Sequence, residues 1–136
     1  MSDQPVPVGD VQVSSGLPSA AQARRLVMDL LAAAPGDTSR VQADASLVVS
    51  ELVSNAERHG GGLVAFRAGL TADGSGLRLQ VEDASRDLPH AQRVLGESPD
   101  RAGGFGWPIV MRLAASVTVE DLPGGGKRIV AVLPLV

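Results

Sequence analysis

The apolar pattern of this chain changes its period at three consecutive glycines, Gly60 to Gly62. Before them, apolar residues recur every three or four positions, as they do on the buried face of an amphipathic helix. After them, short runs rich in valine and leucine are separated by turn residues, as in a sheet of paired strands. A chain of 136 residues is expected to form a single domain, so both patterns must share one core. The expected fold class is therefore α+β.

Two helices are expected before the glycines. The first has a capping box that begins at Ser19, followed by an apolar stripe from Ala23 to Ala34 that a Pro-Gly pair ends. The second would be capped by the hydroxyl of Thr38 or Ser39 and would continue through Ala56 to the glycines.

Strands and one further helix are expected in the rest of the chain. Residues 1–16 have the composition of an edge strand or extended arm. A short helix is predicted from Pro108, a residue suited to a first helical turn. Residues 84–106 lack apolar periodicity and are predicted to form a long, functional loop. The other predicted strands, which would form two hairpins, are Leu63–Leu70, Leu77–Val81, Ser116–Glu120 and Arg128–Leu133.

These elements predict a two-layer sandwich, in which helices pack on one face of a mostly antiparallel, mixed sheet. Composition then excludes several kinds of site. The chain has no cysteine and two histidines, which disfavours a zinc site and removes any thiol nucleophile. A net charge of −3, with two phenylalanines and one tryptophan, disfavours nucleic-acid binding. No signal peptide or membrane span is apparent, so a cytoplasmic protein is expected.

A row of polar residues lies along one face of the second predicted helix. Glu51, Asn55 and His59 are four residues apart, so they lie on one helix face beside the apolar stripe. Such a row at the edge of a buried face needs a partner, which can be solvent, other protein groups or a ligand. Taken singly, the Glu-x-x-x-Asn pair fits a solvated helix face, and Asp83 fits a turn.

Three segments in a fixed order carry a resemblance to a known family. They are Glu51-x-x-x-Asn55 near a helix end, Asp83 at a strand end, and Gly104-Phe105-Gly106 at the start of a helix. Together they resemble the ATP site of the histidine kinase-like ATPase superfamily (GHKL, Bergerat fold). The run from Val49 to Gly60 is most similar to the first motif of the bacterial anti-sigma factors that are also serine protein kinases. The resemblance covers residues 17–133.

The resemblance implies a site for ATP and Mg²⁺, with residues 84–106 as the loop over the nucleotide. The amide oxygen of Asn55 would bind Mg²⁺, which prefers hard oxygen ligands. Glu51 would be the general base toward a serine hydroxyl or water. Asp83 would accept a hydrogen bond from the exocyclic amine of adenine. The other implied nucleotide-binding residues are Gly103, Gly104, Gly106, His59 and Lys127.

The same resemblance implies a function in transcription regulation. Members of that family phosphorylate a serine on an anti-anti-sigma antagonist, sequester a sigma factor and commonly form homodimers. No direct contact with nucleic acid or membrane is implied.

Four residues of this chain depart from the family motifs: Arg86, Phe105, Trp107 and Arg128. Arg128 stands where the family has a threonine that helps to bind adenine. An alternative function is therefore an interaction module that has the ATPase fold but no phosphoryl transfer. A detached catalytic domain that phosphorylates histidine is a third interpretation.

Overall fold

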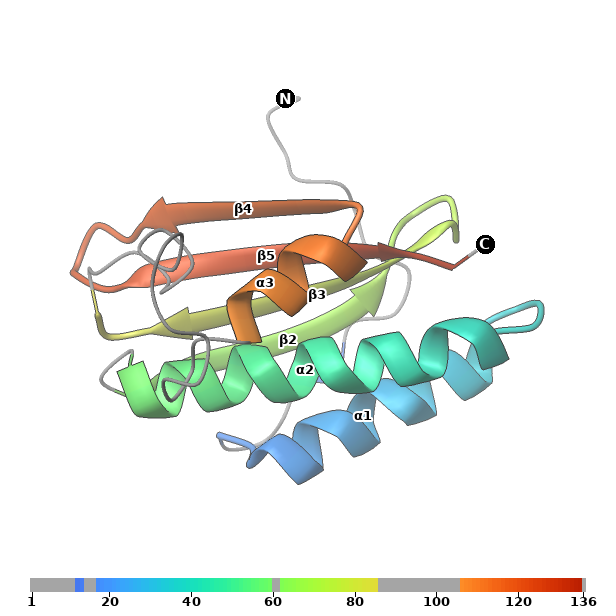
Figure 1. Cartoon of the computed structure of the whole chain (residues 1–136), viewed down its shortest axis with the longest axis horizontal. Coiled ribbons are helices and arrows are strands. Elements are labelled where there is room, and N and C mark those ends of the chain that lie inside the picture. Colours follow the sequence, from blue (N-terminus) through green and yellow to red (C-terminus); the bar gives the residue numbers. More distant parts are fainter. Residues whose placement is uncertain (1–11, 14–16, 60–61, 86–105, 136) are drawn as a thin grey trace.

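The computed structural model describes residues 12–13, 17–59, 62–85 and 106–135, with the backbone alone for Gln12, Val13 and His59. These residues form three helices that pack on one face of a five-stranded sheet (Figure 1). The order of strands in the sheet is β1-β2-β3-β5-β4, and each neighbouring pair is antiparallel. The predicted α+β, two-layer fold is confirmed, and the described sheet is antiparallel throughout rather than mixed.

The elements lie close to their predicted positions. Helix α3 begins at Gly106, before the expected start at Pro108. β1 pairs with β2 as an edge strand, and the rest of the predicted arm lies outside the described residues. The helices are α1 (Ala20–Ala33), α2 (Ser39–His59) and α3 (Gly106–Leu113), and the strands are β1 (Gln12–Val13), β2 (Leu63–Leu70), β3 (Gly76–Asp83), β4 (Ser116–Asp121) and β5 (Lys127–Pro134).

Helix α1 begins with the predicted capping box. The Ser19 hydroxyl accepts from the backbone amide of Gln22 at 3.1 Å, and the Gln22 side-chain oxygen accepts from the Ser19 amide at 2.9 Å. Two of the backbone N–H groups at this helix end are thereby satisfied.

The start of α2 differs from the expected hydroxyl cap. The Thr38 hydroxyl donates to the carbonyl oxygen of Leu31 at 3.1 Å, so it connects α2 to the end of α1. A carboxylate instead satisfies the amide of the first α2 residue: Asp37 Oδ1 accepts from the Ser39 amide at 3.0 Å. This hydrogen bond is the largest cause of the lowered pKa of Asp37.

The core lies between α2 and the centre of the sheet. Helix α2 is long enough to cross the sheet, with α1 on one side of it and α3 on the other (Figure 1). Alternate residues of β5 are buried against the helices, and the residues between them lie on the opposite, open face of the sheet. The fully buried side chains at the centre include Val48, Val49 and Leu52 of α2 and Leu77, Leu79 and Val81 of β3.

The two central strands are distant in the chain. β3 and β5 are neighbours in the sheet, although α3 and β4 lie between them in the sequence. Their register places Asp83 directly opposite Lys127. None of the helices within the described ranges is long and apolar enough to cross a lipid bilayer.

Candidate nucleotide site

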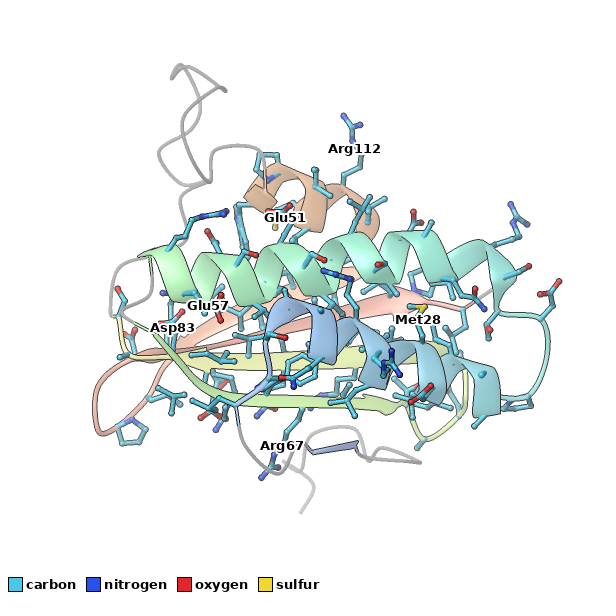
Figure 2. All side chains as sticks on the ribbon, turned by 90° about the horizontal axis from the view of Figure 1, so that it is seen from below. Met28, Glu51, Glu57, Arg67, Asp83 and Arg112 are labelled. Carbon is cyan, nitrogen blue, oxygen red and sulfur yellow. The ribbon has the colours of Figure 1, made fainter. Side chains whose placement is uncertain are left out.

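Helix α2 presents Glu51 and Asn55 on the side that faces α3. The preceding residue, Ser50, faces α1, where its hydroxyl accepts from Arg24 Nη1 at 2.9 Å. Glu51 is therefore turned away from α1, and Figure 2 shows it beside α3. Glu51 and Asn55 are both half-buried, and neither side chain has a hydrogen bond or ion pair with another described residue.

The end of α2 is connected to the end of β3 by backbone hydrogen bonds. The Gly62 amide donates to the Ala56 carbonyl at 3.0 Å, and the Gly62 carbonyl accepts from the Ala84 amide at 3.3 Å. Gly62 has a φ of 114°, which favours glycine at this junction. Because Ala56 follows Asn55 and Ala84 follows Asp83, these two predicted site residues lie at the same end of the molecule.

Asp83 forms a buried ion pair with Lys127 at this end of the sheet. The Lys127 Nζ atom lies 3.0 Å from each carboxylate oxygen of Asp83. Asp83 Oδ1 also accepts from the Ser85 amide at 3.0 Å. The exposed fractions of the two side chains are only 6% for Lys127 and 4% for Asp83, so water screens this pair weakly.

Gly126 allows β5 to approach the end of β3. Its φ of 89° lies in the left-handed region. A Cβ atom on Gly126 would overlap the Asp83 carbonyl oxygen. Glycine is therefore required by both the conformation and the contact, and the contact places the next residue, Lys127, against the Asp83 carboxylate.

Several predicted residues are placed only in part. Gly106 is the first residue of α3, and His59 is the last residue of α2. The His59 side chain, Gly103, Gly104 and residues 86–105 of the predicted loop lie outside the described residues. The phosphate-binding glycines and the loop over the nucleotide therefore stay predictions.

Two of the departures from the family motifs have structural explanations. Trp107 is 3% exposed and belongs to the hydrophobic core at the start of α3. Arg128 lies on the open face of the sheet, where it pairs with Glu82 at 2.8 Å and with Glu120 at 3.2 Å. Lys127, and not Arg128, shares a face with Asp83.

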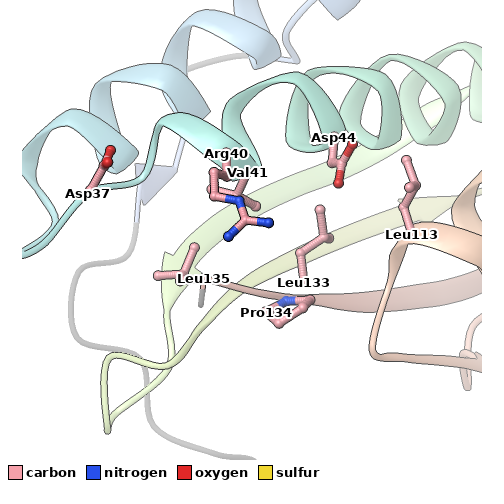
Figure 3. A pocket seen from close by; sticks show the side chains of 8 residues that line it. All are labelled: Asp37, Arg40, Val41, Asp44, Leu113, Leu133, Pro134 and Leu135. Carbon is pink, nitrogen blue, oxygen red and sulfur yellow. The ribbon is translucent and has the colours of Figure 1, made fainter.

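A separate cavity of about 490 Å³ lies beside the first turns of α2 (Figure 3). None of the predicted site residues lines it. Glu51 and Asn55 belong to the second half of α2, so this cavity is distinct from the candidate nucleotide site. Its lining residues are Asp37, Arg40, Val41, Asp44, Leu113, Leu133, Pro134 and Leu135.

The donor set of the candidate site fits Mg²⁺ that is bound together with a nucleotide. No group of three or more histidine, aspartate or glutamate side chains suited to a metal occurs in the described part of the chain. Asn55 offers one neutral oxygen ligand. Mg²⁺ characteristically takes one or two protein ligands, with its other positions filled by water and phosphate oxygens.

Comparison with protein families agrees with this fold. An antiparallel sheet covered on one face by helices is the arrangement expected of an ATPase domain of the histidine kinase-like type. Residues 13–133 match the profile described as histidine kinase-like ATPase domain, and the chain therefore belongs to this family. Membership in it indicates nucleotide binding. Comparison with curated proteins gave no sequence match.

Proposed function

We propose that this domain binds Mg-ATP and transfers a phosphoryl group to a serine of a partner protein. The observation that carries the proposal is the position of Asn55 and Asp83 at the same end of the molecule, connected through Gly62. Nucleotide binding needs a metal ligand and a group that recognises the base, and these two side chains have the required chemistry.

Each residue has a separate task in this proposal. ATP supplies its γ-phosphoryl group to the serine oxygen, and ADP leaves as the bond to the β-phosphate oxygen breaks. The Asn55 amide oxygen binds Mg²⁺, and the Asp83 carboxylate accepts from the amine of the base. Glu51 is one helical turn before Asn55 on the same helix and takes the proton of the serine hydroxyl. Gly103, Gly104, Gly106 and His59 complete the phosphate side of the site, with residues 84–106 over the nucleotide.

The regulatory part of the proposal rests on the resemblance of residues 49–60 to anti-sigma factor kinases. The phosphorylated partner is then an anti-anti-sigma antagonist, and the sequestered partner is a sigma factor. The protein acts in the cytoplasm as a homodimer.

One observation favours the alternative of an interaction module without phosphoryl transfer. Asp83 is already paired with Lys127, so part of its capacity to accept hydrogen bonds is used. The departures Phe105, Trp107 and Arg128 also favour the alternative; Trp107 lies in the core, and Arg128 pairs with Glu82 on the open face of the sheet.

Calorimetric titration with ATP and Mg²⁺ tests the proposal. The wild-type domain should bind ATP, and Asp83→Asn should weaken binding by at least about 10-fold, because a neutral amide oxygen replaces the charged acceptor of the hydrogen bond from the base. Asp121→Asn is the matched control, because Asp121 is an exposed acid that lies opposite Lys127 on β4. No binding by a folded wild-type domain, or equal affinities for all three proteins, would reject the nucleotide site.

A further inference from the structure

The ion pair between Asp83 and Lys127 has hydrogen-bonding capacity that its internal contacts do not use. A carboxylate has about four lone-pair positions, and an ammonium group has three N–H donors. Asp83 Oδ1 accepts from both Lys127 and the Ser85 amide, whereas Oδ2 has, among the described residues, the ion-pair contact with Lys127 Nζ at 3.0 Å and no other. Within the described part of the chain, Oδ2 and the Lys127 ammonium therefore keep unused hydrogen-bonding positions on atoms that lie 3.0 Å apart.

We propose that Lys127 is a specificity-determining residue, which donates to a ring nitrogen of the bound nucleobase while Asp83 accepts from the neighbouring amine. This inference rests on the proposed function, in which Asp83 recognises the base. Adenine has its ring acceptor N1 next to the N6 amine, so its edge matches a donor and an acceptor that lie side by side. A carboxylate alone would contact only the amine.

The geometry of the sheet selects Lys127 for this role. Lys127 is directly opposite Asp83 in the register of β3 and β5, and its side chain lies on the same face. The approach of Gly126 to the Asp83 carbonyl oxygen fixes the position of the next residue. Arg128 is on the other face, where its guanidinium forms ion pairs with Glu82 and Glu120.

Burial strengthens the hydrogen bond that Lys127 would donate to the base. Both side chains of the pair are almost completely removed from water. A charged donor in such a place forms a stronger hydrogen bond than a neutral hydroxyl would. Replacement of the ring nitrogen should therefore weaken binding strongly, even when the amine of the base is kept.

The test compares ATP with 1-deaza-ATP, in which a C–H group replaces N1 and the amine is retained. For the wild-type domain, calorimetry should show affinity for 1-deaza-ATP about 10- to 100-fold lower than for ATP. For Lys127→Met, the two ligands should bind with affinities within about twofold of each other, since the donor to N1 is gone. Arg128→Met is the matched control, and it should discriminate between the ligands as the wild type does.

The outcomes separate this inference from the proposed function. If the folded wild-type domain does not bind ATP, the nucleotide site itself is rejected. If ATP binds but Lys127→Met still discriminates against 1-deaza-ATP as strongly as the wild type, or the wild type does not discriminate, the role of Lys127 is rejected. Should Lys127→Met fail to fold, Asp83→Asn with Lys127→Met replaces it, because this double variant buries no unpaired charge. The double variant should likewise lose the discrimination, and its retention would overturn the inference.

Discussion

Gly126 packs against the backbone carbonyl of Asp83 so closely that no side chain fits between the two residues. The contact joins the turn before β5 to the last residue of β3. It also places Lys127 where its ammonium reaches both oxygens of the Asp83 carboxylate. One glycine therefore sets the geometry of the buried ion pair at the candidate nucleotide site.

Gly126→Ala should destabilise the domain by at least about 2 kcal/mol, because alanine is strained at a φ of 89° and its Cβ meets the backbone. The free energy of unfolding in urea measures this effect. Gly124→Ala is the matched control, since a Cβ at Gly124 would meet nothing within 4 Å and its φ is not positive. We expect the control to lie within about 0.5 kcal/mol of the wild type. Equal stability of both variants would contradict the close approach.

Asn55→Ala should remove the Mg²⁺ dependence of ATP binding, because its amide oxygen is the proposed protein ligand of the metal. Affinity for ATP in the presence of Mg²⁺ should fall by at least about 10-fold. Calorimetry with and without Mg²⁺ measures the change, and alanine is compatible with the helix. Ser54→Ala serves as the control on the adjacent position of α2. Retained Mg²⁺ dependence in Asn55→Ala would place the metal elsewhere.

Glu51→Gln should lower the rate of phosphoryl transfer and leave ATP affinity almost unchanged. Loss of a general base reduces the rate by about 10²- to 10⁴-fold, whereas glutamine has nearly the same shape as glutamate. Single-turnover transfer to the partner serine and calorimetry together separate the two quantities. Glu57→Gln changes an exposed glutamate on the same helix and should retain the wild-type rate. If Glu51→Gln loses affinity and rate to the same extent, Glu51 binds the nucleotide rather than a proton.

Asp73 should titrate far below the usual range of an aspartate. The backbone amide of Ser75 donates to its carboxylate at 3.0 Å, and the hydroxyls of Ser75 and Thr71 each donate at 2.8 Å. These bonds, led by that of the Ser75 amide, lower the pKa of Asp73 from 3.8 to about 2. Since the folded-state pKa is below the unfolded value, the stabilisation is complete above about pH 4 and is lost as the pH falls through about 2.

NMR titration of the Asp73 carboxyl carbon checks this prediction directly, with an expected midpoint near pH 2. In urea unfolding, the difference in stability between the wild type and Asp73→Ala should become smaller as the pH approaches that midpoint. A midpoint near 3.8 would show that the turn between β2 and β3 does not bind the carboxylate in solution.

The sequence predicted the elements whose signals are local. The capping box of Ser19 and Gln22 placed the start of α1, and the apolar spacing predicted most of α2. The glycine-containing segments between strands marked both hairpins. Asp83 was expected at the end of a strand, and it is the last residue of β3.

The features that the sequence did not predict depend on contacts between distant segments. The Thr38 hydroxyl finds its acceptor on Leu31, at the end of another helix, so local capping rules could not place it. The ion pair between Asp83 and Lys127 requires that β3 and β5 be neighbours. The one signal for it was the strict alternation of β5, which assigns Lys127 and Arg128 to opposite faces once the register is known.

The central position of β5 also has a consequence for how the protein folds during synthesis. Asp83 and Lys127 are 44 positions apart, and their strands pair only after α3 and β4 have been made. Until then, a nascent chain on the ribosome would present one edge of β3 with unpaired backbone N–H and C=O groups. Strands of other chains can pair with such an edge. Closing so distant a pair is entropically slow. We therefore expect chaperones to be needed for the unfinished domain. A nucleotide site that includes both Asp83 and Lys127 would form only in chains in which β3 and β5 have paired.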